Sequence, residues 1–468
     1  MVTHFFSPLR RCCVVEVTDS IARFICSTHW ESLPHEVIEI AKLHILDTVG
    51  VLIAGSKEKI AEIVKSYIQS LGCREECSLI TQKIKTSAPY AAFGNGILGH
   101  VLDFDDYEVP SLSMAHSSVT VLPPVIALGE KFRSTGKECL EAYLVGMEVI
   151  SRVGGGINPD HYDKGWHSTG TVGTLGSASA SSKLLKLDPE KTKMAIGIAS
   201  SMSSGLRGNF GTMTKPFHAG HAARCGVESA ILASLGFTAS KNIIERDLGY
   251  CNIFTEGNKY DLGKITANLG SPFALISPGV GLKPYPSCGA THSFLDAVFH
   301  LIDEFDIKAE DVDSVECGIY YLYTKMLIHP RPRTGLEGKF SLEFCIALAL
   351  KERSAKVSQF TDSKVQDPMI QELIKRIKKS VVEGAGGRGT DYPNMTITIF
   401  LKNGKSYTYK VQPGRGSPLN PLSTGEVVNK FVDCATVNYT RDKVQQVLEL
   451  VMNIEKFDDI TELVKLIV

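Results

Sequence analysis

Residues suited to acid–base chemistry gather most densely between Thr214 and Gly226, in the stretch TKPFHAGHAARCG. It contains Lys215, His218 and His221 and follows a run that is almost free of charge. A lysine that leaves apolar surroundings beside imidazoles is suited to holding a carboxylate or moving a proton. The alternative is a lysine at the mouth of a helix, with its stem packed and its amine in water.

The two histidines of this stretch also have the spacing of a metal-binding pair. His218 and His221 lie three residues apart, on one face of a possible helix. The HExxH pattern that uses paired histidines also supplies an acidic residue, and none lies beside this pair. The twelve cysteines are scattered and lack the spacings of a zinc site. We therefore expect no metal ion, and reduced thiols in a cytosolic protein.

A second cluster is acidic. Asp103, Asp105 and Asp106 lie within four residues, with Tyr107 directly after them and His116 downstream. Three neighbouring carboxylates repel one another, so at least one needs a raised pKa or a cationic partner. The alternative is a solvated loop that caps the next helix. The D-x-D-D pattern also fits helical terpene cyclases, but aromatic residues make up only 8% of the chain and the cationic clusters would serve no purpose there.

Two further segments combine reactive side chains with a constrained backbone. His167 follows Trp166 on a glycine-flanked turn before a helix of small residues, and amides at a helix N-terminus favour anions. The stretch from Lys283 to His292, KPYPSCGATH, has two prolines that fix the backbone before Cys288. Cys288 could donate or accept a proton if its pKa is depressed. The alternatives are a histidine hydrogen-bonded in a turn and a small buried cysteine.

Whole-chain properties limit where these clusters can act. A chain of 468 residues is too long for one simple core, so two domains are expected. A net charge of −1, with basic and acidic residues well mixed, argues against a nucleic-acid surface. No uninterrupted apolar run has membrane-spanning length. Residues 1–15 carry Arg10 and Arg11 and no acid, a faint similarity to an organelle presequence, so we expect a cytoplasmic location and leave an organellar matrix open.

The pattern from about Val17 to about Phe273 is helical. Apolar residues recur at helical spacing after Pro34, Asp188-Pro189 has the composition of a helix start, and Gly236 that of a helix end. Several segments in this region are rich in Ala, Gly and Ser. Small side chains allow helices to approach closely, so a tightly packed, largely buried bundle is expected.

The character of the chain changes near Pro278. Residues 312–323 alternate like a strand, and two more alternating runs, 395–402 and 405–411, flank Asn403-Gly404, a strong hairpin signal. These runs predict an antiparallel sheet.

Helical segments are expected between these strands, around 342–351 and 369–379, and a capping box at Ser423–Glu426 opens two final amphipathic helices. The final helices resemble the first region, so the helical domain is interrupted by an insertion. The predicted fold is therefore mainly α, with a large discontinuous all-helical domain (17–275 and 417–468) and a smaller α+β lid domain containing an antiparallel sheet (276–416).

Taken in order, five motifs resemble those of the MmgE/PrpD family. They are Leu102-Asp-Phe-Asp-Asp106 with His116, Gly165-Trp-His167, Lys215-Pro-Phe-His218, Lys283-Pro-Tyr-Pro286 and Gly338-Lys-Phe-Ser341, and Ile45-Leu-Asp-Thr-Val-Gly50 is similar to the family's first helix. The resemblance runs from about residue 17 to the C-terminus. It implies a helical domain with an α+β lid, a homodimer, and no metal or organic cofactor.

Members of the family remove a proton from, or deliver one to, a carbon next to a carboxylate. The resemblance implies that Asp103, His116, His167 and Lys215 line the site and that Lys283 and Cys288 lie on a lid-side loop. Cys288 stands where the animal decarboxylases of the family carry a histidine, and Tyr107 replaces their threonine. We expect catalytic roles for Lys215, His167, His116, Asp103 and Cys288, and substrate binding by Lys283, His218, Tyr107 and Ser287.

The expected function is a cofactor-independent lyase for a small di- or tricarboxylate, by dehydration of the 2-methylcitrate type or decarboxylation of the cis-aconitate type. Lys215 would orient the substrate, His167 and His116 would handle protons, and Cys288 would be the opposing acid or base. The alternative is an epimerase of an iminodisuccinate-like dicarboxylate, with bases on two faces. A helical scaffold without chemistry and a terpene cyclase are less expected. We expect the binding partner to be a small carboxylate substrate, and we expect binding to neither nucleic acid nor a membrane.

Overall fold

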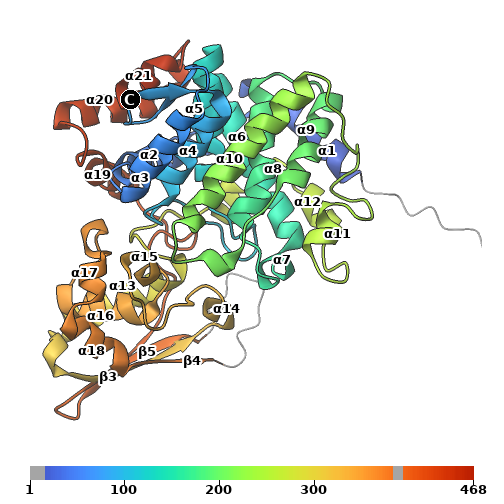
Figure 1. Cartoon of the computed structure of the whole chain (residues 1–468). Coiled ribbons are helices and arrows are strands. Elements are labelled where there is room, and N and C mark those ends of the chain that lie inside the picture. Colours follow the sequence, from blue (N-terminus) through green and yellow to red (C-terminus); the bar gives the residue numbers. More distant parts are fainter. Residues whose placement is uncertain (1–15, 383–393) are drawn as a thin grey trace, which may run out of the picture.

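Most of the chain folds as a bundle of helices, and a smaller α+β part is inserted before the last of them (Figure 1). The computed structural model describes residues 16–382 and 394–468, so the sequence feature at residues 1–15 lies outside the described residues. The first helices are α1 (Val17–Ser27), α2 (His35–Gly55), α3 (Lys59–Ser70), α4 (Ala88–His100), α5 (Ser118–Phe132), α6 (Gly136–Ile157), α7 (Asp160–Asp163), α8 (Ser168–Leu184), α9 (Pro189–Met202), α10 (Thr214–Ser234), α11 (Tyr250–Phe254) and α12 (Leu262–Thr266). The chain ends with α19 (Thr424–Ala435), α20 (Arg441–Met452) and α21 (Thr461–Ile467). The mainly α fold class is confirmed.

Glycines hold three central helices together. A Cβ on Gly96 of α4 would lie 2.9 Å from the Cα of Gly220 in α10. A Cβ on Gly226 of α10 would lie 2.2 Å from the Oγ of Ser177 in α8. Only a residue without a Cβ permits these approaches. These contacts therefore hold α4, α8 and α10 at short range from one another, as the small-residue segments predicted.

The inserted part, called the lid below, contains a four-stranded sheet in the order β4-β3-β5-β6. Its strands are β3 (Val312–Ile319), β4 (Ile377–Val381), β5 (Thr396–Leu401) and β6 (Ser406–Lys410). Its helices are α13 (His292–Phe305), α14 (Tyr321–Thr324), α15 (Gly335–Gly338), α16 (Leu342–Glu352), α17 (Asp362–Val365) and α18 (Pro368–Arg376). The predicted hairpin is present, and Gly404 has the positive φ, +86°, that its turn requires.

Three local expectations differ from the structure. The sheet is mixed rather than wholly antiparallel, because β4 runs parallel to β3. The helix expected over 369–379 ends at Arg376, where Ile377 starts β4 and pairs with Val315. The strand expected over 312–323 ends at Ile319, before α14. The otherwise helical part also holds a short antiparallel pair, β1 (Cys77–Leu79) with β2 (Ile84–Thr86).

The buried apolar side chains form two main cores. One extends over residues 17–280 and 431–467 and so joins the first helices to the last ones. The other lies within residues 285–411, between the sheet and the helices of the lid. The exact domain limits stay a prediction. Among the described residues, no helix has the length and apolar character needed to cross a membrane.

Candidate active site

A cavity of about 160 Å³ lies between the helical part and the lid. Six of the predicted site residues line it, namely Asp103, Tyr107, His116, His167, Lys215 and Cys288. Lys283, His218 and Ser287 do not line it but lie in the layer behind. Lys283 contacts Asp103, His218 contacts His167, and the Oγ of Ser287 is 2.8 Å from Thr291 Oγ1.

Asp103 is the centre of the charged network. It follows α4 in a left-handed backbone conformation, with φ of +51°, and its side chain is buried. Lys215 Nζ lies 2.7 Å from its Oδ1, and Lys283 Nζ lies 3.1 Å from the same atom. Burial opposes ionisation of Asp103, but the two ammonium groups outweigh it and lower its pKa well below the usual value. The acidic cluster is therefore not a solvated loop.

Lys215 lies in the first turn of α10, with its side chain buried rather than in water. Its Nζ also donates a hydrogen bond to His100 Nε2 at 2.7 Å. Burial lowers the pKa of Lys215, and the charge of Asp103 opposes this shift. The lysine is therefore held as a buried cation at the wall of the cavity by one carboxylate and one imidazole.

His100 is a member of the site that the sequence did not single out. It ends α4, and its Nδ1 lies 2.9 Å from Asp105 Oδ2. Because Lys215 donates to Nε2, the hydrogen of the neutral ring lies on Nδ1 and is donated to Asp105. Burial lowers the pKa of His100 to about 3, so the ring is neutral at physiological pH. His100 thus connects Asp105 to Lys215 through two hydrogen bonds, and these bonds fix the orientation of the three side chains.

His116 and His167 present ring nitrogens to the cavity from different elements. His116 precedes α5, and its Nδ1 donates to the carbonyl of Asp106 at 2.7 Å, which leaves Nε2 as an acceptor. His167 caps α8, and its Nδ1 lies 3.0 Å from Nδ1 of His218. Burial lowers the pKa of His167 well below the usual value, and its Nε2 is buried without a hydrogen-bond partner. A bound substrate is the natural partner for that nitrogen.

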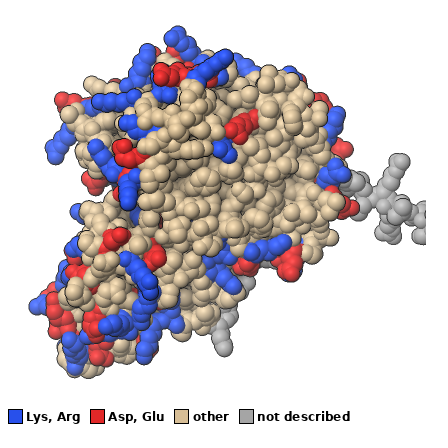
Figure 2. Space-filling model, in the orientation of Figure 1, with Lys and Arg blue, Asp and Glu red and all other residues tan. Residues whose placement is uncertain are grey.

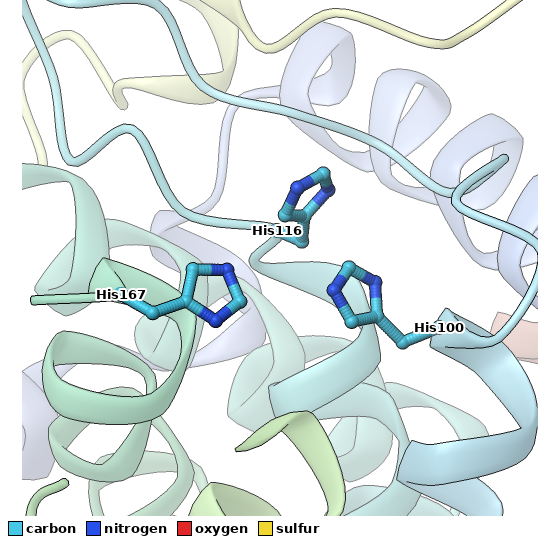
Figure 3. A group of neighbouring side chains, drawn as sticks. All are labelled: His100, His116 and His167. Atoms are coloured by element: carbon cyan, nitrogen blue, oxygen red, sulfur yellow. The ribbon is translucent and has the colours of Figure 1, made fainter. Parts of the chain in front are cut away.

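Figure 3 shows the rings of His100, His116 and His167 turned toward one another. Nitrogen atoms of the three rings lie within 4.8 Å of one another, a spacing that a metal ion could bridge. However, both nitrogens of His100 are engaged, Nδ1 by Asp105 and Nε2 by the ammonium of Lys215. A metal cation there would have to displace this ammonium and would be repelled by it. The donor set does not fit a metal ion while Lys215 keeps its place. In the other pair, His218 Nδ1 lies 3.0 Å from His167 and His221 Nε2 lies 3.2 Å from the carbonyl of Met202, so the two rings contact different partners.

Three buried lysines hold the loop that carries Asp103. Lys339 Nζ donates to the carbonyl of Leu102 at 2.6 Å, Lys283 Nζ to that of Asp103 at 2.9 Å, and Lys430 Nζ to that of Phe104 at 2.6 Å. The first two lysines come from the lid, and Lys430 comes from α19. Consecutive carbonyls are thus fixed from both parts of the molecule, which explains how the loop keeps its left-handed conformation.

Replacing Lys339 by methionine is expected to lower kcat about tenfold, because it leaves two buried carbonyls, those of Leu102 and Pro286, without a donor. Lys339→Gln keeps a donor and is expected to recover part of this loss. Steady-state kinetics of both variants test the effect. Equal kcat in Lys339→Met and the wild type would show that the lysine does not position the loop.

Cys288 lies at the cavity, on the lid-side loop, with its backbone N–H bonded to the carbonyl of Lys339. Burial, followed by the charge of Asp103, raises the pKa of its thiol to about 11. The sequence had allowed a depressed pKa, and the structure gives the opposite direction. The thiol is therefore protonated at neutral pH and can act as a proton donor.

Burial of neutral histidines predicts a stability that depends on pH. Burial lowers the pKa of His218 to about 4 and those of His100, His161 and His292 to about 3. Unfolded histidines titrate near pH 6.5, so only the unfolded state takes up these protons as the pH falls from about 6.5 to about 4. The free energy of unfolding should fall by about 1.4 kcal/mol per pH unit for each such histidine.

Urea unfolding at about pH 7 and about pH 5 measures this slope. His161→Gln is a useful comparison, because glutamine keeps a donor and an acceptor for Phe254 and Thr171, the partners of His161. This variant should lower the change in unfolding free energy per pH unit by the contribution of one histidine, about 1.4 kcal/mol. An unfolding free energy that is the same at both pH values would contradict the prediction.

Two family models cover almost the whole chain. The model of the MmgE/PrpD N-terminal domain matches residues 19–263, and that of the MmgE/PrpD C-terminal domain matches residues 285–456. Among curated proteins, the cis-aconitate decarboxylase of Mus musculus is 29% identical over 96% of this chain and 93% of its own length. The cis-aconitate decarboxylase of Aspergillus terreus is 26% identical over 96% of both chains. A cis-aconitate decarboxylase-like protein of Aspergillus oryzae is 25% identical over 96% of this chain and 97% of its own length.

Proposed function

Because the chain belongs to the MmgE/PrpD family, we propose that it is a lyase that removes carbon dioxide from a small tricarboxylate of the cis-aconitate type. The proposal rests on the pair of buried lysines, Lys215 and Lys283, that share the single carboxylate oxygen of Asp103. Of these groups, Lys215 brings a positive charge to the wall of the cavity, whereas the second carboxylate of the network, that of Asp105, lies behind His100. This charge attracts a substrate carboxylate and stabilises negative charge that develops beside it.

The chemistry of decarboxylation needs few groups. When the bond to a carboxylate breaks, carbon dioxide leaves and the electron pair stays on the substrate. If the leaving carboxylate is attached to the carbon next to a double bond, the pair forms a new double bond, and the far carbon of the old one takes up a proton. Each turnover then consumes one proton and yields carbon dioxide and an unsaturated dicarboxylate. Lys215 is placed to hold a carboxylate whose oxygens receive negative charge during this shift.

The proton donor in this proposal is Cys288. Its thiol is protonated at neutral pH and lies at the same cavity as Lys215. The apolar part of the lining also favours a step in which a charged carboxylate becomes neutral carbon dioxide. The epimerase alternative needs a thiolate as its second base, which the raised pKa of Cys288 disfavours. The thiolate left by this step regains a proton from solvent water, with the neutral rings of His116 and His167 at the cavity as relays.

A panel of three acids tests the function. The purified protein is incubated with cis-aconitate, 2-methylcitrate and iminodisuccinate, and the mixtures are followed by NMR. We expect carbon dioxide and one unsaturated dicarboxylate from cis-aconitate. An unsaturated tricarboxylate from 2-methylcitrate alone would instead indicate a dehydratase. Deuterium entering recovered iminodisuccinate from heavy water, without a new product, would indicate an epimerase and overturn the lyase proposal.

We also propose that the chain forms a homodimer through the outer face of α10. Figure 2 shows a broad face with few charged side chains over α10 and the helices beside it. Large apolar side chains are exposed at both ends of this helix, with Met213 and Phe217 at the start and Leu235 and Phe237 at the end. A helix of 21 residues is about 30 Å long, enough for an interface of ordinary size. Apolar patches of this extent mark contact surfaces.

Light scattering tests the dimer. The wild type is expected to have twice the chain mass of 51.0 kDa, and the double variant Leu235→Glu with Phe237→Glu to have the chain mass itself. These positions lie at the far end of α10 from Lys215, so the site is not altered directly. Val437→Glu, at another exposed apolar residue, is the control and should leave the mass unchanged. A wild-type mass of 51.0 kDa would contradict the proposal.

A further inference from the structure

Arg207 carries a buried positive charge that lacks a counter-ion. It lies in the short turn Arg207–Asn209 after α9, and only 8% of its surface is exposed. Its Nη1 donates a hydrogen bond to the carbonyl of Lys325 in the lid at 2.5 Å, whereas its Nε is buried without a hydrogen-bond partner. None of the ion pairs among the described residues includes Arg207. Arginine stays charged in proteins, and a buried charge without a counter-ion is unfavourable.

Tyr162 connects this charge to the cavity. The guanidinium carbon of Arg207 lies 4.0 Å from the centre of the Tyr162 ring, and Tyr162 itself lines the cavity. Burial raises the pKa of Tyr162, the charge of Arg207 opposes this shift, and the charges of Cys288 and Asp103 add to it. The phenol is therefore protonated at neutral pH and lies within electrostatic reach of both groups. It can donate a hydrogen bond to a ligand in the cavity.

The backbone that positions His167 also positions Arg207. The N–H of His167 donates to the carbonyl of Gly205 at 3.0 Å, and the N–H of Arg207 donates to the carbonyl of Gly165 at 2.9 Å. Two segments are thus bonded to each other on both sides of Trp166. This pairing fixes the guanidinium relative to the acid–base groups of the site.

The acids that line the cavity do not neutralise Arg207. Among the described residues these acids are Asp103 and Glu108. Asp103 pairs with Lys215 and Lys283, and Glu108 accepts hydrogen bonds from three serine hydroxyls, those of Ser113, Ser117 and Ser151. A carboxylate that enters the cavity beside Tyr162 is therefore the anion that would complete the surroundings of Arg207.

We infer that Tyr162 and Arg207 form a second carboxylate-binding point of this site, separate from Lys215. The inference rests on the proposed function and adds two residues to it. The phenolic O–H of Tyr162 donates to a carboxylate of the substrate. Arg207 is a positioning residue behind the ring, and its charge strengthens this hydrogen bond. With one carboxylate at Lys215 and another at Tyr162, the substrate has a fixed orientation relative to Cys288.

The experiment measures binding, so it does not depend on turnover. The probes are propane-1,2,3-tricarboxylate, which has no double bond, and its two monoamides, in which either the central or one terminal carboxylate is neutral. Titration calorimetry gives the Kd of each probe. A hydrogen bond to a charged group changes an equilibrium by about tenfold or more. Amidation at one of the two positions should therefore weaken binding to the wild type about tenfold, and binding to Arg207→Met less than about threefold.

Three further variants separate charge from structure. Arg207→Lys keeps the charge and should keep most of the amidation effect. Tyr162→Phe keeps the packing against Arg207 but cannot donate, so the effect should be lost. Arg331→Met is the matched control, because Arg331 also donates to a carbonyl, that of Ile374 at 2.8 Å, but does not line the cavity. Its amidation effects should equal those of the wild type.

Two results would overturn the inference. If Arg207 only joined the lid to the helical part, Arg207→Met would weaken the binding of all three probes by the same factor. A wild type that binds none of the probes would also contradict it. Carbon dioxide release from cis-aconitate, measured on the same sample, tests the proposed function separately. Binding with the expected amidation effect but without release would overturn the lyase and leave the second binding point standing.

Discussion

Replacing Lys215 by methionine is expected to lower kcat/KM about a thousandfold. Lys215 lines the cavity and, in the proposed function, its ammonium meets the substrate carboxylate; loss of one preorganised electrostatic contact typically costs two to three orders of magnitude. Methionine fills a similar volume, so packing against Phe210 and Phe340, whose rings lie within 5.4 Å of Nζ, is largely kept. Steady-state kinetics on the best substrate of the panel measure the effect.

Lys57→Met is the matched control, because Lys57 is exposed and is not among the residues that line the cavity. Its kcat/KM should equal that of the wild type. Far-ultraviolet circular dichroism should show the same helical signal for both variants. A Lys215→Met variant that keeps more than a tenth of wild-type activity would show that the lysine does not hold the reacting carboxylate.

The second large effect is expected for Asp103→Asn, on both activity and stability. The amide cannot neutralise Lys215 and Lys283, whose ammonium groups would then face each other across the position that the carboxylate now holds. Removing one partner of a buried ion pair typically costs about 3–5 kcal/mol. The free energy of unfolding should fall by that amount, and kcat/KM by about a thousandfold.

Urea unfolding and steady-state kinetics measure the two effects of Asp103→Asn. Asp313→Asn, at an exposed position of β3, is the control and should change neither quantity. A further comparison is the double variant that combines Asp103→Asn with Lys283→Met and so removes one of the two cations along with the carboxylate. It should recover part of the lost stability but not the activity. If Asp103→Asn alone were as stable as the wild type, the network would not have the energetic role assigned to it.

From the sequence, the residues of the site could be predicted more successfully than the groups that they contact. At least one carboxylate of the acidic cluster was expected to have a raised pKa or a cationic partner, and the structure gives Asp103 two such partners, Lys215 and Lys283. Lys215 was singled out because few charges surround it, and this same feature explains why its amine is buried. These inferences succeed because they depend on local composition, which determines whether a side chain leaves water.

His100 could not be found in this way. Its role depends on the contact of α4 with α10, which places its ring against Lys215, 115 residues later in the chain. The available signal was weak, a histidine at the end of a helix of small residues, three positions before Asp103. Likewise, Lys339 lies in one of the recognised motifs, but only the folded chain shows that it donates to the carbonyl of Leu102.

The lid shows the same limit for secondary structure. The hairpin of β5 and β6 was predicted because its turn has a strong local signal. The sequence predicts the start of β4 as the end of a helix, because Ile377 continues the apolar spacing of Leu373 and Ile374 in α18. Its conformation is decided by pairing with β3, about 60 residues earlier, and no local pattern reports that contact.

One measurement tests the central claim most directly. Cis-aconitate is incubated with the enzyme in heavy water, and both carbon dioxide and the deuterium content of the product are measured. We expect equal amounts of carbon dioxide and an unsaturated dicarboxylate that carries one deuterium on carbon, and formation of both products about a thousandfold more slowly by Lys215→Met. Recovery of unchanged cis-aconitate, with no carbon dioxide from the wild type, would contradict the proposal of a decarboxylating lyase.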